Sequence, residues 1–404
     1  MSEPLHILCV SSFFKGVDFI RAAHEQGHHI YLLTRSALKD EEWPWESIQD
    51  SYFMEIQQDG TWNMDHLIAG IAHQMREIGF QKIVALDDFD VEQVAHLREH
   101  FRIPGMGSTT VRYFRDKLAM RMKAQEHGIP VPRFSSLFRN QDINNYADIG
   151  DHPWLIKPRS EASATGIQKI HSKDELWSVI NGLGDKRPSY LVEKFAPGDV
   201  YHVDSLIYQG EVLFSNVSQY LDTPFEVAHG GGIFRSVTVE VGSEDDIKLK
   251  ALNKKVMQAF GMQNSASHTE FIKSQETGEF YFLETSARVG GANLAEMVEA
   301  ATGINLWREW AKIELAVAVG EDYQLPPVER TYSGIVVSLS RFQHPDTSSF
   351  QDEEICWRMI KDWHIGLIVR SSDHRRIHEL LDHYTERISK EFHASLNPPD
   401  ASRV

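Results

Sequence analysis

The chain has 404 residues, of which 42% are hydrophobic and 25% are charged, a composition typical of globular proteins. Its length exceeds one ordinary hydrophobic core, so we expect roughly two to four packed units. The formal net charge of −17 disfavours nucleic-acid binding, because an acidic protein repels the phosphate backbone. No apolar stretch approaches the roughly 20 residues of a membrane span, and the first ten residues lack a signal-peptide pattern. We therefore expect a cytoplasmic protein with neither membranes nor nucleic acids as partners.

The first hundred residues alternate between strand and helix patterns. The expected elements are strands at 5–10, 29–34 and 82–86 and helices at 14–26 and 91–100. This alternation predicts an open, mostly parallel sheet of the Rossmann-like type. The loop at 11–16 lacks the G-x-G-x-x-G pattern that a dinucleotide pyrophosphate needs, so a nicotinamide cofactor is not expected.

Proline and glycine mark two boundaries further along the chain, at Pro104-Gly105-Met106-Gly107 and at Leu325-Pro326-Pro327. Between them, strands and helices alternate from about residue 154 to residue 306, and the polar stretch 140–150 predicts a loop. After the second boundary, 332–339 and 364–371 have the pattern of strands. The middle segment is therefore the expected chemical module.

The segment Trp154-Leu155-Ile156-Lys157-Pro158-Arg159 reads as a strand that delivers a lysine to a loop of mostly small residues at 160–167. An ammonium group beside exposed backbone N–H groups can hold phosphates. This is not a P-loop, because Lys157 precedes the loop instead of ending it. A surface salt bridge is the plain alternative for such a lysine.

A second apolar strand, Tyr190 to Phe195, breaks into a turn at Pro197-Gly198. Backbone groups in such a segment can bind the edge of an adenine ring. An acid beyond the turn, Asp199, can accept hydrogen bonds from ribose hydroxyl groups. The alternative is an ordinary exit from a strand into a turn.

Two acids, Glu270 and Glu284, each interrupt an aromatic or aliphatic run. The turn at Thr277-Gly278 predicts that the two runs form one antiparallel hairpin with both carboxylates on the same side. A partly buried carboxylate pair is costly unless a cation neutralises it, and Mg²⁺ prefers oxygen ligands. Solvated strand acids are the alternative.

In this order, the motifs resemble the ATP-grasp superfamily, whose members grip ATP between two α+β subdomains. The resemblance covers roughly residues 1–395 and is strongest from 115 to 295. It implies four parts. These are an N-terminal Rossmann-like domain at 1–105, ATP-grasp subdomains at 106–190 and 191–324, and a C-terminal α+β closing domain at 325–404.

The resemblance also implies site residues. The two phosphate-binding lysines fall on Lys117 and Lys157. Further ATP contacts are expected from Ser163, Thr165, Gly166, Glu193, Lys194, Phe195, Ala196, Asp199 and Tyr201. Magnesium, or manganese in its place, is expected on Glu270, Glu284 and Ser286. The family motif Glu-x-Asn-x-Arg reads Glu284-Thr285-Ser286-Ala287-Arg288 here, so serine replaces the asparagine ligand.

Two residues are candidates for catalysis. Arg288, beside the expected metal, can stabilise charge on a transferred phosphoryl group, and its alternative is an interdomain salt bridge. His229 lies in the glycine-rich stretch Val227–Gly232, and the resemblance implies a loop here that closes over the reacting centre. An exposed histidine without a role is the alternative.

The resemblance implies an ATP-dependent ligase that phosphorylates a small-molecule carboxylate and couples the acyl phosphate to an amine, releasing ADP and phosphate. A homodimer is common among similar proteins. One alternative is a carboxylating enzyme, similar to biotin carboxylase or to enzymes acting on a purine intermediate. A second alternative is a nucleotide-binding regulator without turnover.

Overall fold

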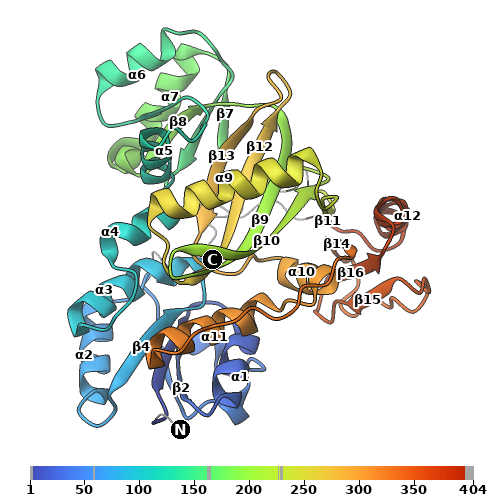
Figure 1. Cartoon of the computed structure of the whole chain (residues 1–404). Coiled ribbons are helices and arrows are strands. Elements are labelled where there is room, and N and C mark those ends of the chain that lie inside the picture. The colour runs from blue at the N-terminus through green and yellow to red at the C-terminus, as the bar shows by residue number, and fades with distance from the viewer. Residues whose placement is uncertain (1–2, 58–59, 162–164, 226, 228–230, 396–404) are drawn as a thin grey trace.

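The computed structural model describes residues 3–57, 60–161, 165–225, 227 and 231–395, which form three β-sheets. Figure 1 shows the largest sheet between an N-terminal sheet and a small sheet. The expected mixture of a parallel sheet with antiparallel α+β parts is confirmed. None of the described helices combines the length and apolar character needed to cross a bilayer.

The N-terminal sheet is parallel, with the order β3-β2-β1-β4. Its strands are β1 His6–Ser11, β2 His29–Arg35, β3 Asp50–Met54 and β4 Phe80–Ala85. Its helices are α1 Val17–Glu25, α2 Met64–Gln74 and α3 Val91–Phe101. Three strands and two helices match the sequence prediction, whereas β3 and α2 were not predicted. The carboxyl ends of β1 and β4 lie side by side, where ligands of parallel sheets bind.

The small sheet is antiparallel, with the order β5-β8-β6-β7. Its strands are β5 Phe134–Ser136, β6 Trp154–Pro158, β7 Gln168–Ile170 and β8 Tyr190–Lys194, and the nearby helices are α5 Lys117–Glu126, α6 Asn140–Ala147 and α7 Lys173–Leu183. The predicted loop at 140–150 is wrong over most of its length. Residues 140–147 form a helix because Ile143, Tyr146 and Ala147 share one face and pack against Trp154.

The largest sheet is antiparallel, with the order β13-β12-β9-β10-β11-β14-β16-β15. Its strands are β9 Gly198–Tyr208, β10 Glu211–Tyr220, β11 Phe234–Thr238, β12 Ser265–Ser274, β13 Phe280–Ser286, β14 Tyr332–Leu339, β15 Ile355–Arg358 and β16 His364–Ser371. The strands predicted at 332–339 and 364–371 are confirmed. They continue this sheet, because β14 pairs with β11.

Four helices surround the largest sheet: α9 Glu244–Phe260, α10 Leu294–Thr302, α11 Leu306–Val319 and α12 His374–Glu391. Helix α9 covers one face, where Phe260 packs against Phe282, which in turn contacts Phe271. Helix α11 joins the sheet to the N-terminal unit, since Trp310 contacts Phe19 of α1. Burial of these apolar side chains holds the helices and the N-terminal unit against the largest sheet.

Candidate active site

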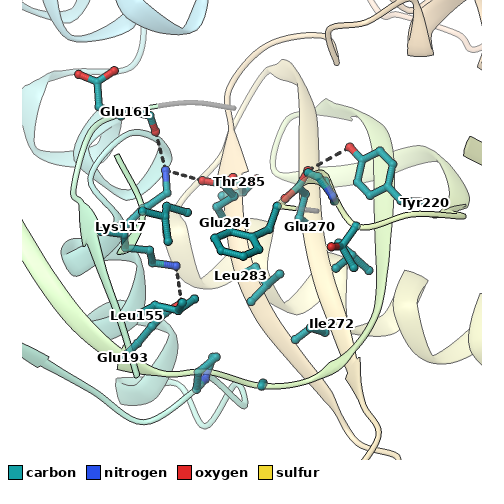
Figure 2. Close-up of a pocket in the computed structure, with 18 of the residues that line it drawn as sticks. Lys117, Leu155, Glu161, Glu193, Tyr220, Glu270, Ile272, Leu283, Glu284 and Thr285 are labelled. Atoms are coloured by element: carbon teal, nitrogen blue, oxygen red, sulfur yellow. Dashed lines mark hydrogen bonds and ion pairs between the residues drawn. The ribbon is translucent and has the colours of Figure 1, made fainter. Parts of the chain in front are cut away.

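A cleft of about 880 Å³ is lined by residues of the small sheet and of the largest sheet. Figure 2 shows side chains from both sheets pointing into it. The structure brings twelve of the predicted site residues together here: Lys117, Lys157, Thr165, Glu193, Lys194, Phe195, Ala196, Asp199, Glu270, Glu284, Ser286 and Arg288. Residues far apart in the sequence thus converge on one cavity.

The predicted acidic hairpin is confirmed, because β12 and β13 are antiparallel and Glu270 lies directly opposite Glu284. Opposed residues in such a pair point to the same face, and here that face lines the cleft. Ser286, two residues beyond Glu284, also lines the cleft, as the period of a strand requires. Phe271 and Phe282 are buried in the core beneath α9. The apolar neighbours therefore hold the acids at the cleft surface.

Lys117 bridges the cleft to this hairpin. Helix α5 begins at Lys117 because the Asp116 carboxylate accepts a hydrogen bond from the Leu118 amide. Lys117 Nζ lies 2.5 Å from Glu284 Oε2 and donates to the Glu161 carbonyl at 2.7 Å (Figure 2). Burial opposes ionisation of Glu284, but the charge of Lys117 prevails and lowers the pKa of Glu284 to about 2. Glu284 is therefore an ionised carboxylate at neutral pH.

Lys157 has a different partner. Its ammonium group binds Glu193 Oε1, and Arg121 on α5 donates from Nε and Nη2 to Glu193 Oε2 at 3.1 and 2.9 Å. Burial lowers the pKa of Lys157 to about 8, although the adjacent Glu193 carboxylate favours the charged form. The Glu193 side chain is thus engaged with two cations. This ion-paired role of Glu193, and Arg121 itself, were missed by the sequence analysis.

The segment predicted to bind adenine has one free backbone donor among the described residues. The Lys194 and Phe195 amides donate to the carbonyls of Arg133 and Pro153, at 2.7 and 3.0 Å. No described group accepts from the amide of Ala196, which lines the cleft. The Lys194 ammonium group donates to Glu276 Oε2 at 3.0 Å.

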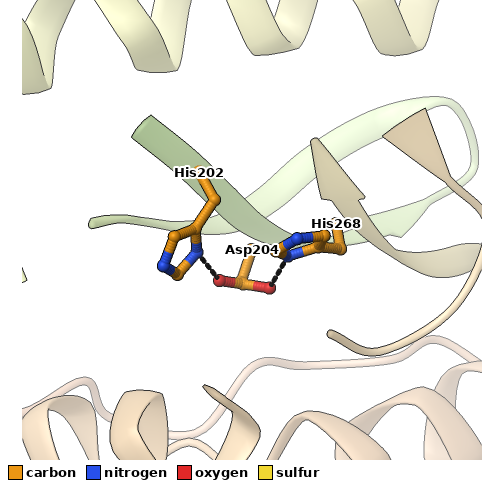
Figure 3. A group of neighbouring side chains, drawn as sticks. All are labelled: His202, Asp204 and His268. Carbon is orange, nitrogen blue, oxygen red and sulfur yellow. Dashed lines mark hydrogen bonds and ion pairs between the residues drawn. The ribbon is translucent and has the colours of Figure 1, made fainter. Parts of the chain in front are cut away.

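Glu270 is held by a chain of buried polar groups. Tyr220 donates its hydroxyl hydrogen to Glu270 Oε1 at 3.0 Å and lies 3.3 Å from His268 Nε2. The Asp204 carboxylate contacts Nδ1 of His268 at 2.8 Å and Nδ1 of His202 at 2.7 Å (Figure 3). Burial opposes protonation of His268, but the Asp204 charge raises the pKa of His268 to about 9. Asp204 and His268 therefore restrain Tyr220 and Glu270.

The same three groups, His202, Asp204 and His268, are close enough to suggest a metal centre. Their contacts are hydrogen bonds instead, because an ionised carboxylate only accepts and each Nδ1 atom must then donate to it. His202 Nε2 is also engaged, at 2.8 Å from Ser236 Oγ. A side chain at Gly290 would lie 2.9 Å from Asp204 Oδ1, so the close approach of the backbone there requires glycine. The cluster is therefore a hydrogen-bond network, and its member His268 also lines the cleft.

The cleft extends to the carboxyl edge of the N-terminal sheet. Arg288 lines it and donates to the Val289 carbonyl at 2.8 Å. Arg115 Nη1 donates to Asp88 Oδ2 at 2.9 Å, and both of these side chains also line the cleft. Neither Asp88 nor Arg115 was predicted to belong to the site. The Asp87-Asp88 pair directly after a parallel strand was the signal available.

Tyr201 is placed differently from the prediction. Its ring packs against Phe280 with a centroid distance of 5.4 Å, and its hydroxyl group lies 3.3 Å from Asp245 on α9. Successive residues of a strand face opposite sides, so Val200 lines the cleft and Tyr201 lies in the core. The assignment of Tyr201 to the nucleotide is therefore corrected.

One further described residue among the predicted set, Gly166, does not line the cleft. Gly166 lines a separate cavity of about 570 Å³ beside Arg159, to which Thr165 also contributes. Ser163 and His229 lie outside the described residues.

The chain is similar in sequence to an amino acid ligase. No family model matches the chain. It is 28% identical over 261 residues to the L-arginine-specific L-amino acid ligase of Bacillus subtilis, covering 62% of this chain and 61% of that one. The chain thus spans about three fifths of the length of this curated relative.

Solved structures share the fold. The L-amino acid ligase from Bacillus licheniformis has a TM-score of 0.75 at 16% identity, covering 97% of this chain and 99% of that one. The biotin carboxylase domain of Hydrogenobacter thermophilus 2-oxoglutarate carboxylase, in complex with MgADP and bicarbonate, has a TM-score of 0.71 at 16% identity. It covers 96% of this chain and 90% of that one. The fold, the arrangement of the lysines and acids and these similarities together confirm the predicted resemblance to the ATP-grasp superfamily.

Proposed function

We propose that the protein is an ATP-dependent ligase that activates a small-molecule carboxylate as an acyl phosphate and couples it to an amine. The observation that carries this proposal is the convergence of two lysines and two opposed acids on one cleft. The name of the Bacillus subtilis relative supports amino acids as the substrate class. ADP, phosphate and an amide or peptide bond would be the products.

The cations of the cleft suit a triphosphate. Lys117 and Lys157 are both buried at the cleft surface, and Lys169, which the sequence analysis missed, lies 3.7 Å from the centre of the Phe195 ring. Each ammonium group has three donors, so a lysine that binds one carboxylate can still bind a phosphate oxygen. The free Ala196 amide can donate to the adenine edge, and Asp199 can accept from the ribose.

The acids of the cleft suit magnesium. Glu270 and Glu284 present carboxylate oxygens on one face of a hairpin, and the Ser286 hydroxyl oxygen is compatible with the same oxygen-rich coordination. When bound, the ion would neutralise the phosphate charge and align the transferred group. Manganese, which accepts similar oxygen ligands, is proposed as a substitute.

The reaction requires little covalent chemistry from the protein. A carboxylate oxygen of the substrate attacks the γ-phosphorus of ATP, the bond to the bridging oxygen breaks, and ADP leaves. The amine then attacks the acyl carbon, phosphate leaves, and the amine loses a proton. Arg288, which lines the cleft, would stabilise negative charge on the transferred group.

The test is to incubate the protein with Mg²⁺, ATP and pairs of amino acids, and to follow ADP, phosphate and ligated product. We expect ADP and phosphate in equal amounts, dependent on both substrates. AMP with pyrophosphate would contradict the mechanism.

A carboxylating activity is the second candidate, favoured by the structural similarity to the biotin carboxylase domain. ADP release that depends on bicarbonate and needs no amine would support it instead. Nucleotide binding without any turnover would favour the regulator. A homodimer and a cytoplasmic location are further proposals, which sedimentation and cell fractionation would test.

A further inference from the structure

Arg121 is a buried arginine that contacts both walls of the cleft without lining it. It lies one helical turn after Lys117 on α5, on the same side of the helix. Its Nη1 atom donates to the Leu283 carbonyl on β13, while Nε and Nη2 donate to Glu193 on β8. Three of its five donors are therefore used to join two sheets.

The Glu193 carboxylate is shared between two cations. Oε2 accepts from Arg121, and Oε1 accepts from Lys157. Two positive groups and one negative group leave one net positive charge. Without Arg121, the charges of Lys157 and Glu193 would cancel. A buried carboxylate that lost Lys157 to a ligand would then be left without a partner, which is strongly unfavourable.

We propose that Arg121 is a charge-compensating residue that neutralises Glu193 so that the charge of Lys157 stays available to a phosphate in the cleft. This inference rests on the proposed function, because it requires the cleft to bind ATP. Arg121 itself need not touch the nucleotide. It acts through Glu193 and Lys157 and is therefore a positioning residue.

A comparison with Lys117 explains why the partner of Lys157 needs a second cation. The partner of Lys117 is Glu284, which would pass to the magnesium ion when Mg·ATP binds. Glu193 lies on a different strand from the two proposed metal acids. Its charge must therefore be balanced by the protein itself, and Arg121 is the second cation in contact with it.

A purely structural role makes a different prediction. If Arg121 and Glu193 only hold the two sheets together, loss of either side chain weakens ATP binding, and loss of both does not restore it. If charge compensation is the role, the neutral variant Glu193→Gln needs no compensation and rescues Arg121→Met. A double-mutant cycle separates these readings.

The experiment is calorimetric titration of the full chain with ATP in excess Mg²⁺. We expect Arg121→Met to weaken binding roughly 10- to 100-fold. Glu193→Gln should bind as tightly as the wild type or more tightly, and the double variant should return to within about threefold of it. Unchanged affinity in Arg121→Met, or a double variant as weak as Arg121→Met, would overturn the inference.

Lys82→Met is the matched control. Lys82 and Glu314 form another buried ion pair, at 2.9 Å, that does not line the cleft, so this variant should lower the melting temperature and leave ATP affinity unchanged. Should Arg121→Met not fold, Glu193→Gln still decides, since weaker binding by that variant alone overturns the inference. A wild-type protein that binds no nucleotide contradicts the proposed function instead.

Discussion

The two lysines proposed to bind phosphates, Lys117 and Lys157, are neutralised in different ways. Lys157 pairs with Glu193 within the small sheet, whereas Lys117 crosses the cleft to Glu284 on the largest sheet. A ligand that separates Lys117 from Glu284 must supply a cation to the acid and an anion to the lysine. Mg·ATP supplies both. The Lys157 pair can persist, because the third charge of Arg121 is already present.

The largest expected effect comes from removing the charge of Glu284, the acid that pairs with Lys117 across the cleft. Glu284→Gln should lower turnover by roughly a thousandfold or more, because a neutral amide is a poor magnesium ligand. The measurement is ADP release at saturating substrates. Glu279→Gln, in the exposed turn of the same hairpin, is the control and should behave as the wild type. Normal turnover in Glu284→Gln would mean that the metal lies elsewhere.

The next largest effect concerns Lys157, whose partner Glu193 lies in the same small sheet. Lys157→Ala should weaken ATP binding roughly 100-fold, since a buried ammonium group at the phosphates is lost. Titration with Mg·ATP measures it. Lys173, an exposed lysine paired with Asp148 at 2.6 Å, provides the control variant Lys173→Ala. Wild-type affinity in Lys157→Ala would place the phosphates away from β6.

The pH dependence of ATP binding tests the same lysine, Lys157. Burial, with the charges of Arg121 and Lys117, lowers the pKa of Lys157 to about 8 against the opposing effect of Glu193. The charged form binds phosphate, so ATP affinity should fall by up to about tenfold between pH 7 and pH 9. Lys157→Arg, which stays charged, should lose much of this dependence.

The stability of the fold should change with pH in the opposite direction to ATP affinity. A lysine whose folded pKa lies below its unfolded value is penalised while charged, so its contribution to stability improves as pH rises from about 8 to 10.5. Comparing the wild type with Lys157→Met in denaturant at several pH values isolates this contribution. A flat difference across that window would contradict the lowered pKa.

The smallest expected effect comes from removing the hydrogen bond that Tyr220 donates to Glu270, the second acid of the hairpin. Tyr220→Phe removes the donor to Glu270 and should raise the magnesium concentration needed for half-maximal activity about fivefold, the value of about 1 kcal/mol of hydrogen bonding. Tyr201→Phe is a matched control on the adjacent strand, because its hydroxyl group lies outside the cleft near Asp245. Equal magnesium dependence in both variants would remove Tyr220 from the site.

Local patterns in the sequence determined much of the fold. The apolar periodicity of β1, β2 and β4 predicted the parallel sheet, and the turn after Gln275 predicted the hairpin that opposes Glu270 and Glu284. These features follow from residue spacing, because a period of two fixes the face on which a strand side chain lies. The same rule could have excluded Tyr201, had the position of Val200 been known.

Tertiary structure alone decided which groups meet across the cleft. Spacing along the chain says nothing of what packs against a strand, so the contacts of Arg121 with Glu193 and of Asp204 with His268 had no sequence signal. The polar stretch 140–147 became a helix only because its few apolar residues could be buried against Trp154. The sequence thus determined the two lysines and two acids as candidates. Burial and charge pairing in the folded chain decided how each is neutralised.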